Sequence, residues 1–265
     1  MKEYNISEVA KMFGISSELL RSYERRGLVA PLRAGNGYRT YTKPDIYILS
    51  GIRFLRNAGY SLEDIERLYG AEFENALSIR QKRCEELEQE ITYLQSKLEA
   101  MRNECDDFAS LSQESGISWT TSPAMLRVNN QINDSFLTDS HSILEWVGHL
   151  PIVRISPAFS REAIVNGRDE VRFGYAVPLE LADTLGLSDT PGAEVKESLR
   201  CLTTIVRSQG KRYLSACMLE SICMFCKNEH LELSGDAWGI TLGVHMKGGR
   251  IQRCHRLYIP VRSIA

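Results

Sequence analysis

The 265-residue chain lacks the features that would mark a membrane or secreted protein. No apolar run approaches the ~20 residues that a bilayer-spanning helix needs. The first residues, MKEYNISEVAKMF, carry acidic side chains and no apolar segment of the kind that defines a signal peptide. We therefore expect a cytoplasmic location and no membrane partner.

Catalytic and cofactor-binding motifs are also missing. The sequence contains no G-x-S-x-G nucleophile turn, no phosphate-binding loop and no H-E-x-x-H zinc motif. Gly248 and Gly249 are expected in a hairpin turn between two strands, and not in a phosphate-binding loop. These absences predict that the chain is not an enzyme and needs no cofactor.

The seven cysteines do not form an even disulfide framework, and in a reducing compartment we expect them as thiols. Cys223 and Cys226 have the C-x-x-C spacing of a redox pair or of half a zinc site. No second such pair and no well-spaced histidine accompany them. We interpret both as packing thiols inside an apolar helix, with no metal, while the spacing leaves a redox role open.

Charge is distributed unevenly along the chain, although the formal net charge is only −2. Residues 1–60 contain ten lysines and arginines against five acids, a net charge of +5, so the remainder carries −7. A basic N-terminal part joined to an acidic remainder indicates that only the first part meets a polyanion such as nucleic acid.

The most regular pattern of the chain lies between Cys84 and Phe108. Apolar side chains recur there in alternating steps of three and four, which places a narrow stripe along a helix about 37 Å long. Such a stripe is too thin for a globular core, so we predict a homodimeric coiled coil; a long surface helix packed on its own domain is the alternative. The predicted dimer seam comprises Cys84, Leu87, Ile91, Leu94, Leu98, Met101, Cys105 and Phe108.

Residues 1–71 contain the capping and turn residues expected for several short helices and a hairpin. Gly14 separates two amphipathic stretches, Ser16 can cap the second, and Gly27 can end it. A glycine-rich turn at 35–37 lies between short extended pieces and predicts a small hairpin. Two more helices are expected to begin at capping pairs, Thr42 with Asp45 and Ser61 with Asp64. The order predicts a winged helix-turn-helix, with its second helix positioned for a major groove.

This part contains five characteristic runs, in the order Ile6-Ser7-Glu8-Val9-Ala10, Gly14-Ile15-Ser16, Leu20-Arg21-x-Tyr23-Glu24-Arg25-x-Gly27-Leu28-Val29-x-Pro31, Gly37-Tyr38-Arg39-x-Tyr41 and Arg56-x-Ala58-Gly59-Tyr60-Ser61-Leu62-x-Asp64-Ile65. These motifs, in this order, resemble those of the MerR family of transcription regulators. The resemblance implies a homodimer that binds promoter DNA. It also implies activation by bending and untwisting the promoter, so that RNA polymerase can engage both promoter elements.

The same resemblance implies which side chains meet DNA. Arg21, on the exposed face of the second helix, can fork to a guanine edge or a phosphate. Arg39 and Tyr41 of the wing can reach phosphates, and Tyr23 is interpreted equally as a core residue or a phosphate contact. The predicted DNA-binding set is Ser16, Ser17, Arg21, Tyr23, Arg25, Tyr38, Arg39, Tyr41 and Lys43.

The C-terminal part predicts a duplicated α+β domain. We expect an N-terminal domain at 1–71, a dimerisation helix at 72–110, a Ser/Gln/Gly-rich linker at 111–118 and an effector domain at 119–265. Helices are expected at 140–149 and 213–230, and strands at 125–128, 152–155, 171–177, 199–206, 238–245 and 254–261. The two halves agree at an offset of 81–83 residues, each reading strand, helix, strand, strand.

The ending Leu257-Tyr258-Ile259-Pro260-Val261, preceded by Gly235-Asp236-x-Trp238-Gly239, resembles the GyrI-like effector-binding domain of multidrug sensors. The resemblance implies a groove between the halves for flat, lipophilic, often cationic compounds, which requires aromatic faces and an acid. The predicted ligand-binding residues are Trp146, Tyr175, Trp238 and Tyr258, with Glu145 or Glu220 as the buried acid. A ligand-independent regulator and a GyrI-like domain with weak hydrolase activity are the alternatives.

Overall fold

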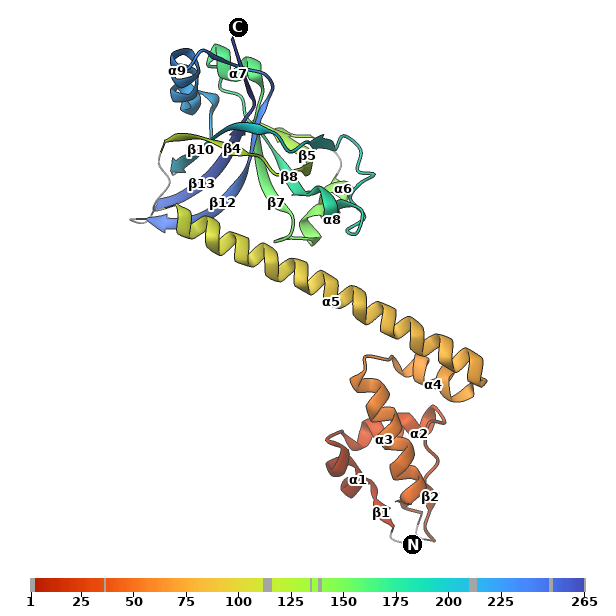
Figure 1. Cartoon of the computed structure of the whole chain (residues 1–265). Coiled ribbons are helices and arrows are strands. Elements are labelled where there is room, and N and C mark those ends of the chain that lie inside the picture. Colours follow the sequence, from red (N-terminus) through yellow and green to blue (C-terminus); the bar gives the residue numbers. More distant parts are fainter. Residues whose placement is uncertain are drawn as a thin grey trace. The chain divides into compact units, whose positions relative to one another are not determined.

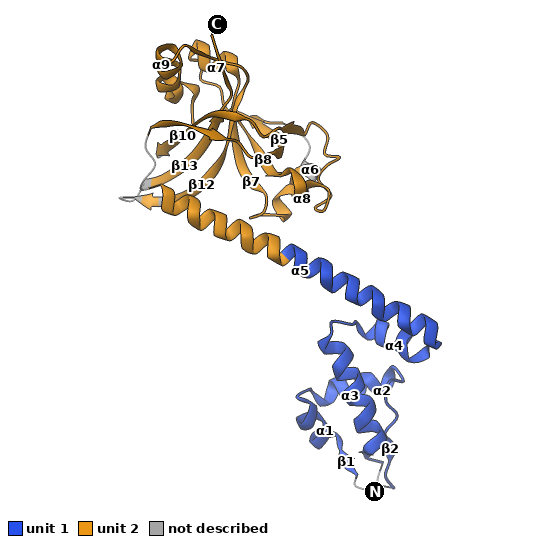
Figure 2. Cartoon of the chain, viewed as in Figure 1, with its two compact units in different colours: residues 1–93 blue, residues 94–265 orange. Residues whose placement is uncertain are grey.

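The computed structural model describes residues 3–35, 37–111, 116–133, 135–137, 140–209, 214–247 and 250–264 (Figure 1). The chain divides into two compact units, residues 1–93 and 94–265 (Figure 2). The long helix α5 (Phe73–Ser110) begins in the first unit and ends in the second. At 1.5 Å per residue its 38 residues span about 57 Å. None of the helices in the described ranges has the length and apolarity needed to cross a membrane.

The first unit is the predicted winged helix-turn-helix. Helices α1 and α2 form the helix-turn-helix, and β3 is the central strand of a three-stranded sheet, between β1 and β2. Two further helices precede α5. The elements are β1 (Tyr4–Asn5), α1 (Ile6–Phe13), α2 (Ser17–Arg25), β2 (Leu32–Arg33), β3 (Arg39–Tyr41), α3 (Lys43–Asn57) and α4 (Leu62–Gly70).

The helices of this unit begin where local chemistry predicts. The Ser16 hydroxyl accepts a hydrogen bond from the Leu19 amide at 3.1 Å and caps α2. The backbone amides of Thr42 and Ser61 donate to the carboxylates of Asp45 and Asp64, so both predicted capping pairs are confirmed. The core between the helices contains Val9, Leu20, Tyr41, Leu49, Ile52 and Ile65, all nearly inaccessible to solvent.

The second unit contains one antiparallel sheet whose strand order is β4-β10-β13-β12-β7-β8-β5-β6, with β9 paired to β5. A two-stranded sheet of β11 and β14 stands beside it. The elements are β4 (Ile117–Thr121), β5 (Met125–Ile132), β6 (Ser135–Phe136), α6 (Ser140–Gly148), β7 (Arg154–Phe159), α7 (Arg161–Asn166), β8 (Arg172–Pro178), α8 (Leu179–Ala182), β9 (Glu194–Lys196), β10 (Arg200–Gln209), the 3-10 helix η1 (Ala216–Leu219), α9 (Glu220–Asn228), β11 (Leu231–Leu233), β12 (Ala237–Lys247), β13 (Arg250–Ile259) and β14 (Val261–Ser263).

The predicted duplication is confirmed by the strand order. In the first half the neighbours are β5-β8-β7, and in the second half they are β10-β13-β12. Each half therefore places its third strand between its first and second. The halves join through β7 and β12, where Ala158 faces Trp238 and Phe159 faces Ala237. The fold is α+β, and its two compact units agree with the predicted multidomain architecture.

Some predicted boundaries are wrong. Ile117 and Ser118, assigned to the linker, lie in β4 and pair with Thr204 and Thr203 of β10. Residues 112–115 of that linker and the Gly248-Gly249 turn fall outside the described residues, although Lys247 and Arg250 pair across the hairpin. The helix expected at 213–230 is η1 followed by α9. The elements α7, α8 and β9, of 6, 4 and 3 residues, are too short to show a hydrophobic period in the sequence.

The two faces of the large sheet pack against different partners, because neighbouring strand residues point to opposite faces. On one face, Phe159, Leu202, Leu257 and Ile259 form the larger core with residues of α7, η1 and α9. The other face carries a smaller cluster of Met125, Ala158, Ala176, Cys201, Trp238 and Tyr258. We call this second side the pocket face.

Candidate functional site

The exposed face of α2 carries two arginines that share one acid. Arg21 and Arg25 each form an ion pair with Glu18 at 3.0 Å, and all three side chains are well exposed. Hydrogen bonds from Arg21 and then Arg25 hold the pKa of the Glu18 carboxyl below its usual value. Exposed ion pairs of this kind contribute little energy, so both guanidinium groups can exchange Glu18 for a phosphate or a base edge.

The wing between β2 and β3 is tied to α2 through Glu24. Its carboxylate binds Arg39 at 2.5 Å and Arg33 at 3.4 Å. The hydrogen bond to Glu24 raises the pKa of Arg39. Tyr38 projects from the wing with 74% of its surface exposed. Neither Glu24 nor Arg33 was among the predicted DNA residues, because sequence spacing does not reveal a contact between a helix and a distant hairpin.

The remaining predicted DNA residues divide into buried and exposed positions. Tyr23 is 4% exposed and Tyr41 is fully buried, so both side chains belong to the core of the unit. Burial raises the pKa of Tyr41, whose hydroxyl has no hydrogen-bond partner among the described residues. Ser17 is the first residue of α2, and Lys43 is the exposed first residue of α3. The burial of Tyr41 gives no support to its predicted phosphate contact.

A pocket of about 370 Å³ opens within the second unit, between the C-terminal turns of α5 and the pocket face of the sheet. Its volume lies within the range of small-molecule sites. The helix contributes Ser96, Glu99, Ala100, Asn103, Asp106 and Asp107. The sheet and its loops contribute Pro123, Met125, Ile152, Arg154, Pro178, Ile240, Arg256 and Tyr258, and α8 contributes Glu180 and Leu181.

The wall of the pocket contains one aromatic residue backed by a second. The rings of Tyr258 and Trp238 are tilted by 41° with centroids 4.8 Å apart, a favourable aromatic geometry. Burial raises the pKa of Tyr258, an effect that an interaction with Arg256 partly offsets, so its hydroxyl stays protonated at neutral pH. The pocket therefore presents an apolar aromatic surface with a polar group at one end.

Charged side chains line the pocket at two levels. Asp107 binds Arg256 at 2.7 Å and Arg154 at 3.2 Å, and all three side chains are mostly buried. The exposed acids Glu99, Asp106 and Glu180 also line the pocket, with α5 providing the first two. Four acids and two arginines give the lining a net negative charge, which favours a cationic guest.

The predicted ligand-binding residues are only partly brought together. Tyr258 lines the pocket and Trp238 supports it from behind. Tyr175 follows Gly174 and precedes Ala176 in β8, which places it on the opposite face of the sheet from the pocket cluster. Trp146 is fully buried in α6, and its indole nitrogen donates a hydrogen bond to the Thr190 hydroxyl at 3.1 Å.

The expectation of a buried acid at Glu145 or Glu220 is wrong. Both side chains are exposed, on α6 and α9 respectively, because these helices turn their apolar sides inward and leave the acids to solvent. The acids that line the pocket come mainly from α5. Sequence reasoning missed them because α5 was interpreted from its apolar stripe alone.

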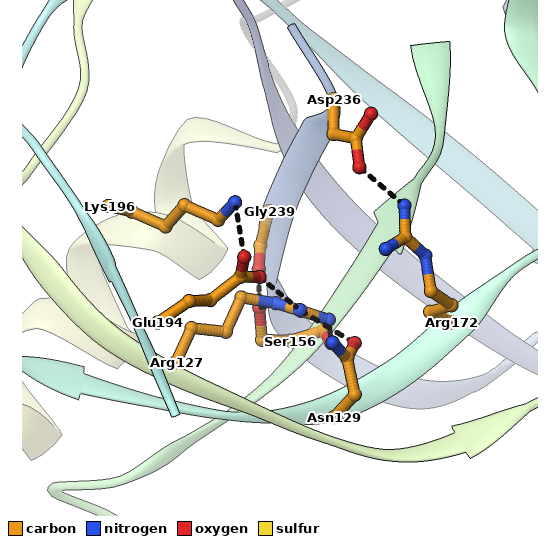
Figure 3. Close-up of polar contacts among 8 residues, drawn as sticks. All are labelled: Arg127, Asn129, Ser156, Arg172, Glu194, Lys196, Asp236 and Gly239. Atoms are coloured by element: carbon orange, nitrogen blue, oxygen red, sulfur yellow. Dashed lines mark hydrogen bonds and ion pairs between the residues drawn. The ribbon is translucent and has the colours of Figure 1, made fainter. Parts of the chain in front are cut away.

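A polar network around the buried Arg127 connects strands of the large sheet (Figure 3). Arg127 of β5 is fully buried and donates to the Ser156 hydroxyl at 2.9 Å, to Asn129 at 2.7 Å and to Glu194 at 3.2 Å. The Ser156 hydroxyl in turn donates to the Gly239 carbonyl at 2.6 Å. Burial lowers the pKa of Arg127 to about 10, so it remains charged at neutral pH. The network therefore links β5, β7, β9 and β12.

The two cysteines of the C-x-x-C motif lie in α9. Cys226 is buried and Cys223 half-buried, and burial raises the pKa of both thiols. A reactive pair has lowered thiol pKa values, because the thiolate is the nucleophile. The described environment therefore agrees with packing thiols.

The apolar stripe of α5 lies open to solvent in the single chain. Leu94 is 62% exposed, and Ile91, Leu98 and Met101 are similarly open. At 3.6 residues per turn, these side chains lie opposite to those that α5 turns toward the pocket. Phe108, the last predicted seam residue, lies close to Gly243 of β12 and is still 49% exposed. Exposed leucines along one helix face indicate a partner surface.

The first unit thus defines a winged helix-turn-helix protein of the kind that binds double-stranded DNA. Residues 4–71 match the family model described as MerR HTH family regulatory protein. The HTH-type transcriptional regulator CueR of Escherichia coli O6:H1 is 38% identical over 117 residues, which cover 40% of this chain and 87% of CueR. The chain belongs to the MerR family and is a DNA-binding transcriptional regulator.

Two solved structures resemble larger or later parts of the chain. A cryo-EM structure of the EcmrR–DNA complex in EcmrR-RPo is 14% identical and covers 98% of this chain and 100% of its own, with a TM-score of 0.37. A hydrolase from Listeria innocua, encoded by lin2189, is 11% identical and covers 55% of this chain and 91% of its own, with a TM-score of 0.33. Similarity at this level assigns no activity to the second unit.

Proposed function

We propose that this MerR-family protein is a ligand-responsive, homodimeric activator whose pocket binds a small lipophilic cation. The observation that carries the proposal is that α5, the helix with the exposed apolar stripe, also forms one wall of the pocket. In this division of labour, residues 1–71 bind DNA, α5 joins two chains, and the domain that follows binds the effector. The motif resemblance of its C-terminal segments to GyrI-like effector domains points the same way.

The ligand class follows from the pocket lining. Tyr258 offers an aromatic surface, and Met125, Ile152 and Ile240 extend it with apolar contacts. The exposed acids on the lining attract positive charge, and a cation near an aromatic face gains further attraction. A flat or bulky organic cation satisfies both features, whereas an anion of the same shape would be repelled by the acids.

Dimerisation is supported by the exposed stripe and by the requirements of DNA binding. A second copy of α5 would bury the leucines that the single chain leaves open, and it would hold two recognition helices for two half-sites. Two DNA-binding domains (residues 1–71 of each chain) held at a fixed spacing can distort the promoter between them, at a cost of roughly 1–6 kcal/mol for smooth bending. RNA polymerase would then engage the distorted promoter, while the ligand contributes only its differential affinity for the activating arrangement.

A pair of isosteric ions tests the proposed ligand class. Tetraphenylphosphonium and tetraphenylborate have the same shape and opposite charge. Near saturation, the cation is expected to raise the melting temperature of the protein by roughly 5 °C or more, because a ligand at 100 times its Kd stabilises by about 2.7 kcal/mol. The borate is expected to have little effect.

The variant Glu99→Gln/Asp106→Asn should reduce the shift caused by tetraphenylphosphonium, since both acids line the pocket. The double variant Glu145→Gln/Glu220→Gln is the matched control, because these acids are exposed on other helices. Absence of stabilisation by any organic cation, or equal stabilisation by both ions, would contradict the proposed ligand class.

A further inference from the structure

Asp107 joins α5 to both halves of the duplicated domain. Its Oδ2 lies 3.2 Å from the Arg154 Nη2, and its Oδ1 lies 2.7 Å from the Arg256 Nη1. Arg154 belongs to β7 of the first half, and Arg256 belongs to β13 of the second half. We call these three side chains the Asp107 bridge.

The bridge is reinforced on both sides. Arg256 also donates to the Ser110 hydroxyl at 3.1 Å, and Arg154 also donates to the Thr241 carbonyl at 2.9 Å. The last turn of α5 is therefore held by two side chains of its own, Asp107 and Ser110. Because all three charged groups of the bridge are largely shielded from water, the ion pairs are screened less than those on α2.

A close backbone approach next to the bridge fixes the position of α5 more tightly. A Cβ atom added to Gly243 would lie 3.0 Å from the Phe108 ring, so the aromatic side chain rests directly on the β12 backbone. The ladder between β12 and β13 is irregular at this point, between Thr241 and Gly243. The end of α5 therefore lies against β12 and β13 (Figure 1), with the Phe108 side chain half-exposed.

The bridge is also part of the pocket. Asp107, Arg154 and Arg256 all line it, and Arg256 interacts with Tyr258, the aromatic residue of the wall. On α5, the residues facing the pocket lie opposite to the exposed leucine stripe. Asp107 lies about two turns beyond Leu98 and Met101 on the same helix, so a change in its ion pairs acts on the helix end next to the turns that present these side chains to a partner.

We propose that the Asp107 bridge is the element through which pocket occupancy changes the position of α5. The inference rests on the proposed function for the identity of the ligand as a cation. A cation beside Tyr258 attracts the Asp107 carboxylate and repels the two guanidinium groups, so the ligand and the arginines compete for one carboxylate. Ligand binding then loosens the contacts of the α5 end with the sheet. In the ligand-free state the bridge is closed.

The substitution Asp107→Asn opens the bridge without a ligand, because it removes the charge and keeps the shape of the side chain. In the full-length protein it should raise ligand-free transcription from the target promoter by roughly 5-fold or more, within the usual range of allosteric coupling. The added induction by tetraphenylphosphonium should shrink correspondingly. Amide hydrogen exchange over residues 100–110 should become faster in the ligand-free variant.

Glu104→Gln is the matched control, because Glu104 lies one turn before Asp107 on α5 and lines neither the pocket nor the predicted seam. It should leave ligand-free transcription and hydrogen exchange as in the wild type. Gly243→Ala is a second perturbation of the same end of α5, since its methyl group would lie 3.0 Å from the Phe108 ring and push that ring by a few tenths of an ångström. If Asp107→Asn does not fold, this variant should reproduce the faster exchange and the raised output.

Several results would overturn the Asp107 bridge as a coupling element. One is unchanged ligand-free transcription and unchanged hydrogen exchange in both Asp107→Asn and Gly243→Ala. Another is an Asp107→Asn protein that loses ligand binding but keeps the ligand-free transcription of the wild type. If the wild type binds no organic cation, the proposed ligand class fails. The ligand-free comparison of Asp107→Asn with Glu104→Gln would still decide whether the bridge controls α5.

Discussion

The carboxylate of Glu24 on α2 lies 2.5 Å from the Nε of Arg39 in the wing, and the same carboxylate reaches Arg33. Three charged side chains thus connect α2 to the hairpin of β2 and β3. A DNA phosphate would compete with Glu24 for both arginines, because the phosphate and the carboxylate are the same kind of hydrogen-bond acceptor. The acid therefore sets how the wing arginines are oriented in the DNA-free protein, and we expect it to limit how tightly they bind DNA of any sequence.

Glu24→Gln should lower the specificity of DNA binding. Releasing Arg33 and Arg39 strengthens nonspecific phosphate contacts, while the looser wing weakens the fixed register on the operator. The ratio of operator affinity to random-duplex affinity is expected to fall, as measured by fluorescence anisotropy at several salt concentrations. Glu63→Gln on α4, an exposed acid away from the wing, is the control. An unchanged ratio would show that Glu24 does not position the wing.

Arg21→Ala and Arg39→Ala should affect DNA binding in different ways. Arg21 lies on the exposed face of α2, so its loss is expected to cost about 1–3 kcal/mol on the operator and less on random DNA. Arg39 is expected to contact phosphate, and its loss should weaken both duplexes equally. Mobility-shift titrations on both duplexes distinguish the two patterns. Equal losses for Arg21→Ala would reassign that side chain to a phosphate.

The elements of the first unit could be predicted from sequence because their signals are local. Ser16, Thr42 and Ser61 lie at the starts of the helices that they cap, and the partner of each cap lies three residues away. The duplicated sheet was likewise visible as repeated strand patterns separated by one helix per half. These features depend on neighbours along the chain.

The pocket could be predicted only in part, because its polar residues meet through the tertiary fold. Asp107 is separated from Arg154 by 47 residues and from Arg256 by 149, so no spacing pattern connects them. Tyr258 was identified from its strand, whereas Tyr175 belongs to a similar strand and points to the other face of the sheet. Which face of a strand meets a pocket depends on packing that the sequence pattern does not contain.

Leu98→Asp should disrupt the proposed dimer. The carboxylate would lie within a stripe that a second α5 helix is expected to bury, where an unpaired charge is costly. Sedimentation velocity should show monomers at micromolar concentrations, and operator binding should weaken strongly because two half-sites are no longer bound together. Leu144→Asp, at a similarly exposed leucine on α6, is the control. A Leu98→Asp protein that remains dimeric would place the interface elsewhere.

His255 should make the second unit less stable in mild acid. This histidine is buried on β13, its Nδ1 lies 3.0 Å from the Thr241 hydroxyl, and burial, with a smaller contribution from Arg253, lowers its pKa to about 4. The unfolded chain binds a proton near pH 6.5 and the folded protein does not until about pH 4. Stability is therefore lost as the pH falls from 6.5 toward 4.

The loss from this one group is about 2 kcal/mol at pH 5, relative to pH 7.5. His255→Gln, which keeps a hydrogen-bonding side chain but does not titrate, should show a smaller difference in unfolding free energy between the two pH values. Urea unfolding of both proteins at pH 7.5 and pH 5 measures that difference directly. Equal pH dependence in the variant and the wild type would mean that His255 does not cause the loss of unfolding free energy in acid. Other groups would then account for any acid sensitivity of the fold.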